Sequence, residues 1–123
     1  MEWTSYYELD VINEFLDSVI AQYPGIVTEF IAGHSFEGRD LRGIKISYQE
    51  GNPGILIDGN IHAREWISSA TATWIINELL TSSNAEVRNI AENYDWYILP
   101  VINPDGFVYS HTTVSQASVT LNG

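Results

Sequence analysis

The chain has 123 residues, 45% hydrophobic and 17% charged, which is the composition of one folded globular domain rather than of a disordered segment. The net charge of -11 repels phosphate backbones and argues against nucleic acid as a partner. No apolar run approaches the roughly 18 residues of a membrane span, so no membrane partner is expected. The first residues carry neither a basic cluster nor an apolar core, so we expect no signal peptide in this chain. Without cysteine, any metal must be held by His, Asp, Glu, backbone or water.

An amphipathic helix is predicted first. Ser5 and Glu8 have the spacing of a capping box, and Pro24-Gly25 ends the helical pattern. We expect Leu16 near the middle of the buried face. The apolar residues at helical spacing are Leu9, Ile12, Leu16, Val19 and Tyr23.

A pair of strands follows the helix. Residues 26–32 and 41–48 have strand patterns, and the segment 33–40 between them is bounded by glycines that are free to adopt positive φ. We therefore predict an antiparallel hairpin with a long connection, and we interpret Arg39 as an anchor of its turn. Residues 49–54 are rich in Gly, Pro and Asn and are predicted to form a loop.

A strand and a helix begin the second half of the chain. Residues 54–60 form a short apolar run, which predicts a strand buried on both faces. Residues 65–80 are apolar around most of a helix circumference, so this helix is expected to be deeply packed. The tryptophans at 66, 74 and 96 are expected to lie in the core.

A second helix and a last strand complete the predicted elements. Ser83 and Glu86 again have capping-box spacing, at the start of a short helix that ends near Asn93. Residues 95–102 are nearly all apolar and predict another buried strand. Asn103-Pro104-Asp105-Gly106 is a strong turn signal.

The element order predicts an α/β fold with a mixed sheet of about four strands and three helices. Two buried strands separated by helices favour a right-handed parallel crossover. We assign residues 1–113 to this domain and treat 114–123 as a separate tail with no charge and no aromatic residue. For that tail an edge strand over Val119 to Leu121 and disorder both remain open.

The junction between the predicted strand 54–60 and the helix 65–80 contains two potential metal ligands, His62 and Glu65. Ligands of open α/β sheets bind beyond the carboxyl ends of strands, and imidazole and carboxylate both suit Zn²⁺. The alternative is a histidine hydrogen-bonded at a strand end and an acid favoured by the first turn of a helix. These residues alone leave both interpretations open.

Three other basic or imidazole side chains are candidates for the same site. His34 lies in a glycine-bounded turn and is expected to be a surface residue, and His111 is expected to be exposed to solvent. Arg64 stands between the two potential ligands. It is either a surface charge or a partner for a peptide carboxylate or carbonyl.

Four motifs stand out along the chain: Tyr6-x-Glu8-Leu9-Asp10, Gly33-x-Ser35-x-Glu37-Gly38-Arg39, Asp58-Gly59-Asn60-Ile61-His62-Ala63-Arg64-Glu65-Trp66 and Pro100-Val101-x-Asn103-Pro104-Asp105-Gly106-Phe107-x-Tyr109. Together, over residues 3 to about 113, they resemble the zinc metallocarboxypeptidases of the pancreatic A/B type. In chain order they are similar to the start of the family's mature domain, its hairpin turn, its zinc-binding signature and the segment after its fourth strand.

The resemblance implies a zinc exopeptidase that removes C-terminal residues from peptides and proteins. It makes His62 and Glu65 two of three protein ligands of Zn²⁺, and it makes Arg64 a residue that binds the substrate. It also implies that a glutamate acts as general base on a metal-bound water. Because the similar family members are secreted as zymogens, an extracellular location is expected.

The chain departs from the family pattern after Thr113. The family continues there with Trp-Arg-Lys-x-Arg, which supplies an arginine for the developing oxyanion, whereas this chain continues with Val114. Four further family elements have no counterpart here: the third zinc ligand, the Asn-Arg pair for the substrate carboxylate, the tyrosine over the pocket and the general-base glutamate. We therefore expect a truncated N-terminal part of the domain, with zinc weakly held and no activity alone.

Two alternatives remain. The chain could be a non-catalytic interaction module that associates with itself through an exposed sheet edge. It could also be a complete small metal hydrolase in which His34 or His111 supplies the remaining ligand.

Overall fold

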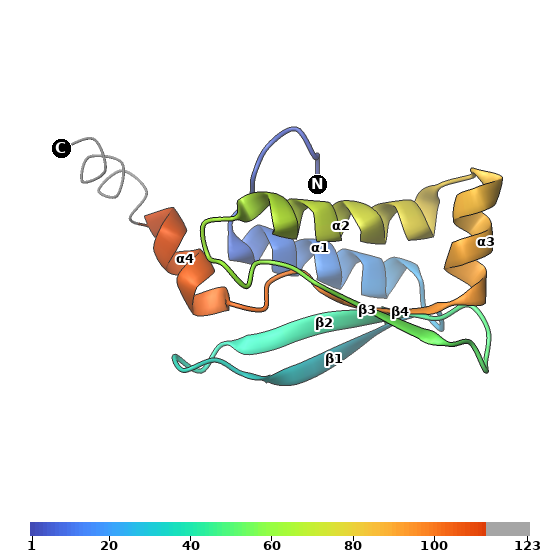
Figure 1. Cartoon of the computed structure of the whole chain (residues 1–123), viewed down its shortest axis with the longest axis horizontal. Helices are drawn as coiled ribbons and strands as arrows, with labels where there is room; N and C mark the ends of the chain where they lie inside the picture. The colour runs from blue at the N-terminus through green and yellow to red at the C-terminus, as the bar shows by residue number, and fades with distance from the viewer. Residues whose placement is uncertain (113–123) are drawn as a thin grey trace.

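The computed structural model describes residues 1–112, which form helices on one side of a mixed sheet (Figure 1). The predicted tail 114–123, with its candidate edge strand, lies outside the described residues. No helix within 1–112 is long and apolar enough to cross a membrane. The elements in chain order are α1 (Leu9–Gln22), β1 (Val27–His34), β2 (Asp40–Ile46), β3 (Gly54–Asp58), α2 (Trp66–Thr81), α3 (Ala85–Asn93), β4 (Asp95–Leu99) and α4 (Pro104–Thr112).

The strands of the described sheet follow the order β1-β2-β4-β3. β1 and β2 pair in antiparallel fashion, as expected for the predicted hairpin, and β4 then pairs antiparallel with β2. β3 and β4 are parallel, with Ile57 opposite Ile98. The predicted α/β class and mixed four-stranded sheet are therefore confirmed for residues 1–112, and so is the parallel pairing across the helical connection.

The main core lies between the sheet and the two long helices. Leu16 of α1 is 1% exposed, which confirms its predicted place at the centre of the buried face. Ile76 of α2 and Ile44, Ile46 and Ile98 of the central strands are fully buried in the same cluster. Figure 1 shows α3 and α4 at opposite ends of this layer. A smaller second cluster, under α4, contains Ile12, Val101 and Phe107.

Two predictions of deep burial are wrong. β3 is an edge strand of the described sheet, so only the face of Ile55 and Ile57 packs on the core, and Leu56 is 64% exposed. The helix α2 buries one face, while Trp74 on another face is 47% exposed. Trp96 is buried as predicted, and Trp66 is half-buried.

The helix starts also differ from the predicted caps. α1 begins at Leu9 after Glu8, without a side-chain cap, so Ser5 does not form the predicted capping box. α3 is capped by Asn84, one residue after the predicted Ser83, because the Asn84 side chain accepts hydrogen bonds from two amides of the first turn.

The predicted turn at 103–106 is the start of the helix α4, which the sequence patterns did not predict. The Asn103 side chain accepts a hydrogen bond from the Gly106 amide at 3.2 Å. Pro104 occupies the first helical position, where its fixed φ suits a helix and its missing N–H removes no bond. A turn signal and a helix start use the same residue types, so both interpretations were compatible with the sequence. The preceding strand is correspondingly shorter and ends at Leu99.

Candidate metal centre

The segment 59–65, here called the ligand loop, connects the end of β3 to the start of α2. The Gly59 amide donates to the Leu99 carbonyl oxygen at 2.9 Å, and the Ile102 amide donates to the Gly59 carbonyl oxygen at 2.9 Å. These bonds continue the parallel pairing of β3 and β4 into the loop. The loop therefore begins at the carboxyl ends of two parallel strands, which is the predicted location for a site.

The two predicted ligands point toward each other across this loop. The distance from His62 Nδ1 to Glu65 Oε1 is 2.9 Å, and the side chains are 74% and 62% exposed. A carboxylate only accepts, so the His62 Nδ1–H donates this hydrogen bond. The Glu65 amide also donates to the His62 carbonyl oxygen at 3.0 Å, which closes the turn between them. One imidazole and one carboxylate are thus within reach of a shared ion.

Asn60 shapes the loop from the inside and was not recognised as important from the sequence. It is 1% exposed and has a φ of 62°, in the left-handed region that asparagine adopts more readily than most residues. Its side-chain amide donates to the Ala63 carbonyl oxygen at 3.2 Å, and its backbone amide donates to Ser68 Oγ at 2.7 Å. The available signal was the Gly59-Asn60 pair directly after a strand, which is typical of a sharp change of direction.

The helix α4 supports the other side of the loop. The Asn103 side chain donates to the Ile61 carbonyl oxygen at 3.2 Å. The Ser110 hydroxyl, which donates to the Phe107 carbonyl oxygen at 2.7 Å, also lies 3.4 Å from the Ala63 carbonyl oxygen. Trp66 Nε1 in turn donates to Ser110 Oγ at 2.9 Å. A methyl group built on Gly106 would lie 2.8 Å from the Ala63 Cβ, so α4 and the loop are in direct contact.

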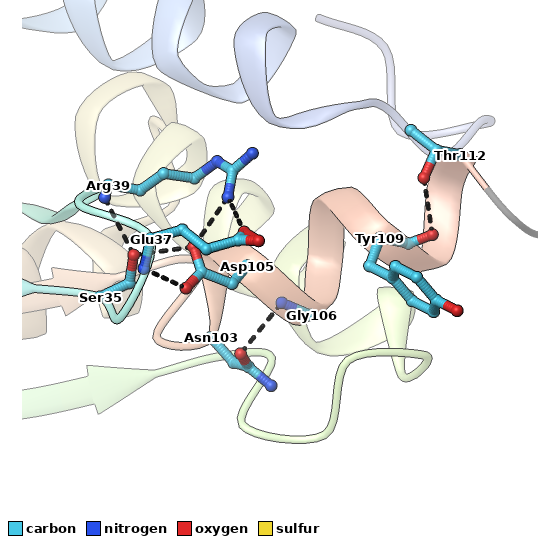
Figure 2. A network of polar contacts seen from close by, with 8 residues as sticks. All are labelled: Ser35, Glu37, Arg39, Asn103, Asp105, Gly106, Tyr109 and Thr112. Atoms are coloured by element: carbon cyan, nitrogen blue, oxygen red, sulfur yellow. Dashed lines mark hydrogen bonds and ion pairs between the residues drawn. The ribbon is translucent and has the colours of Figure 1, made fainter.

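A polar network joins the first turn of α4 to the hairpin between β1 and β2 (Figure 2). Asp105 accepts from the Ser35 hydroxyl at 2.7 Å, from the Glu37 amide at 3.0 Å and from Arg39 Nη1 at 2.8 Å. Arg39 also pairs with Glu37, which confirms its predicted role as an anchor of the turn. Partial burial by itself would raise the pKa of Asp105, but the hydrogen bonds and the Arg39 charge outweigh it and hold that pKa below its ordinary value.

The other histidines do not join the His62–Glu65 pair. His34 ends β1, is 66% exposed and lies 3.1 Å from Asp40, in agreement with its predicted place on the surface. His111 was expected to be exposed, and this is wrong. It is half-buried on α4, where its ring stacks on Trp66 at 4.1 Å and its Nδ1–H donates to the Phe107 carbonyl oxygen. The missed helix explains the error, because only a helix places His111 one turn after Phe107.

The donor chemistry of the loop fits part of a zinc site. Imidazole nitrogen and carboxylate oxygen are both ordinary Zn²⁺ ligands. Among residues 1–112, no group of three or more His, Cys, Asp or Glu side chains is arranged to hold a metal ion. Neither His34 nor His111 therefore supplies a third ligand there, contrary to the small-hydrolase alternative. Arg64, the predicted substrate contact, is exposed on the same loop.

The described residues form an α/β domain with a histidine and a glutamate on the loop after a parallel strand, and comparison with known proteins shows the family to which it belongs. The family model of zinc carboxypeptidases matches residues 12–122, and the chain therefore belongs to the zinc carboxypeptidase family. This confirms the family suggested by the sequence motifs.

Similar proteins are substantially longer than this chain. A zinc carboxypeptidase of Simulium vittatum is 54% identical over 108 residues, which are 88% of this chain and 36% of the relative. Carboxypeptidase B of Helicoverpa zea is 44% identical over 116 residues, 91% of this chain and 27% of the relative. The chain thus spans between a quarter and two fifths of the length of these relatives.

Solved structures support the same fold. The crystal structure of carboxypeptidase A from Helicoverpa armigera superposes with a TM-score of 0.81 at 28% identity, over 90% of this chain and 28% of that one. The structure of thrombin activatable fibrinolysis inhibitor gives a TM-score of 0.81 at 31% identity, over 88% of this chain and 28% of that one.

Proposed function

We propose that this chain is the part of a zinc-dependent carboxypeptidase that carries two of the metal ligands, in an enzyme that removes C-terminal residues from peptides and proteins. The observation that supports this most directly is the convergence of His62 and Glu65 at 2.9 Å. Their loop follows a parallel strand in a chain of the zinc carboxypeptidase family.

In this proposal each loop residue has a separate role. His62 and Glu65 would hold Zn²⁺ through the imidazole and the carboxylate that face each other across the loop. When bound, Zn²⁺ supplies Lewis-acid polarisation of the scissile carbonyl and a lowered pKa of its bound water. Arg64, exposed beside the pair, binds a carbonyl or carboxylate of the peptide near its C-terminus.

The same proposal makes this chain inactive alone. Two donors hold zinc more weakly than three, and a hydrolytic step also needs a general base, an oxyanion partner and a group that binds the terminal carboxylate. We assign the peptidase-domain part to residues 1–113 and treat 114–123 as divergent. We also propose an extracellular location for the whole enzyme, by analogy with the secreted members of the family.

A C-terminal hydrolysis assay tests the inactivity. The purified chain, with added Zn²⁺, is expected to release no terminal residue from a set of peptides that end in apolar, basic or acidic residues. A complete carboxypeptidase of the family, assayed in parallel, is the positive control. Turnover by the purified chain that a chelator abolishes would refute the proposal that it is inactive alone.

A second candidate function is supported by the edge of the sheet. β3 is one of the two outer strands of the described sheet, and Leu56 is 64% exposed on the face that the core does not cover. An exposed apolar edge strand is a template for pairing with another chain, so we also propose self-association through β3. In this interpretation the chain acts as a non-catalytic module that pairs with a second copy.

Light scattering over a range of concentrations tests this second candidate. The chain is expected to form dimers, and Leu56→Lys is expected to return it to a monomer because it places a charge in the pairing surface. Ile67→Lys is the matched control, since Ile67 is 63% exposed but belongs to α2 and not to the edge strand. A wild-type chain that stays monomeric at all concentrations argues against the module.

A further inference from the structure

Asp105 connects two parts of the molecule that are distant in sequence. Three groups of the β1–β2 hairpin, the Ser35 hydroxyl, the Glu37 amide and the Arg39 guanidinium, donate hydrogen bonds to its carboxylate. Figure 2 shows these groups converging on the first turn of α4. The carboxylate is 21% exposed and faces a guanidinium that is 36% exposed, so water screens this ion pair only in part.

The same turn of α4 touches the ligand loop. Asn103, which caps the helix start, donates to the Ile61 carbonyl oxygen, and Gly106 packs against Ala63. Ala63 and Ile61 flank His62 in the chain. A displacement of the first turn of α4 would therefore act on the residues on either side of the predicted ligand.

Apolar packing alone fixes α4 less firmly than it fixes the main core. The buried cluster under α4 contains Ile12, Val101 and Phe107 and is separate from the larger cluster between the sheet and the long helices. A short helix on a small cluster opens locally more readily than the central strands do. The hydrogen bonds of the Asp105 carboxylate are consequently a large part of what fixes the position of α4.

We propose that Asp105 is a positioning residue, which holds α4 against the ligand loop and thereby keeps His62 and Glu65 facing each other. Its effect on the loop is independent of metal, whereas its effect on zinc affinity rests on the proposed function. A group that orients metal ligands from outside the coordination sphere typically changes affinity by about 10-fold or more when it is removed.

Hydrogen exchange on the metal-free chain tests the structural half of the proposal. Asp105→Asn is expected to speed exchange of the Phe107 and Glu65 amides by about 10-fold, because these amides report the α4 turn and the loop turn. Amides of the paired strands β1 and β2 are expected to change much less. Equal acceleration at all sites would overturn the proposal, because it would mean that Asp105 acts only on global stability.

Asp95→Asn is the matched control. Asp95 also accepts from a serine, Ser47 at 2.6 Å, and lies 3.8 Å from a cation, Lys45, but it begins β4 and so lies at the opposite end of that strand from α4. If the loop amides respond to Asp95→Asn as strongly as to Asp105→Asn, the positioning role is wrong. Ser35→Ala, which removes one of the three donors, is a milder variant should Asp105→Asn fail to fold, and about a threefold acceleration is expected there.

Zinc titration tests the functional half. Asp105→Asn is expected to raise the Zn²⁺ dissociation constant by about 10-fold, while Asp95→Asn leaves it within about twofold. If the wild-type chain binds no Zn²⁺ but Asp105→Asn still loosens the loop, the proposed function fails and the positioning of the loop stands. If the chain binds Zn²⁺ and Asp105→Asn changes neither exchange nor affinity, the positioning proposal fails and the proposed function stands.

Discussion

Replacing His62 with alanine is expected to weaken Zn²⁺ binding by about 100-fold, to the level of non-specific binding. His62 is one of the two potential zinc ligands that converge on the ligand loop. Zinc sites with four protein ligands bind with about 10–16 kcal/mol, so one ligand corresponds to about 3 kcal/mol, or roughly 100-fold. Glu65→Ala should have a similar effect, because its backbone bonds at the start of α2 do not involve the carboxylate.

His34→Ala provides the matched control for this experiment. Like His62, His34 has a largely exposed side chain, at 66%, and its Nε2 lies 3.1 Å from the Asp40 carboxylate. It lies at the end of β1 rather than on the ligand loop. Calorimetric titration with Zn²⁺, or the absorption spectrum with Co²⁺, should detect the loss for His62→Ala alone. An equal loss for His34→Ala would show that exposed His–carboxylate pairs bind the metal without any built site.

Two of the three strand pairings in the described sheet, β1 with β2 and β3 with β4, were predictable from local patterns. Alternation in residues 41–48 and the glycines at 33 and 38 indicated a hairpin, and the apolar runs separated by helices indicated a parallel pair. The burial of β3 was not predictable in the same way. An apolar run such as 54–58 indicates a strand, but only the strand order reveals that it lies at an edge.

The two predicted ligands came together because they are three residues apart at a strand–helix junction, a spacing that the backbone closes locally. The parts of the site that the sequence patterns missed depend on contacts between distant segments. Asp105 and Asn103 belonged to a motif interpreted as a turn, and their roles follow only once α4 is placed beside residues 35–39 and 61–63. Local residue patterns carry little information on such long-range contacts.

Replacing Gly59 with alanine is expected to lower the free energy of unfolding by about 3 kcal/mol, at the upper end of what overpacking usually causes. Gly59 is buried where the ligand loop begins, and an added Cβ would lie 2.8 Å from the Pro100 carbonyl oxygen and 2.9 Å from the Ser68 carbonyl oxygen. Both are backbone atoms, which do not turn aside as a side chain does. The Gly59 amide also bonds to Leu99 at the end of β4, and its carbonyl oxygen bonds to Ile102 just after that strand, so the strand end resists displacement.

Gly54→Ala, at the other end of β3, separates this clash from a general effect of replacing glycine with alanine. Gly54 begins β3, is exposed, and its added Cβ would meet only the flexible edge of Tyr97, at 3.2 Å. Its unfolding free energy in urea should stay within about 0.5 kcal/mol of the wild type. An equally small change in unfolding free energy for Gly59→Ala would mean that the end of β3 can move. The backbone bonds of Gly59 would then not fix the start of the ligand loop. If Gly59→Ala destabilises as expected, the folded fraction should also bind Zn²⁺ more weakly, because relief of the clash must shift the residue from which the loop toward His62 begins.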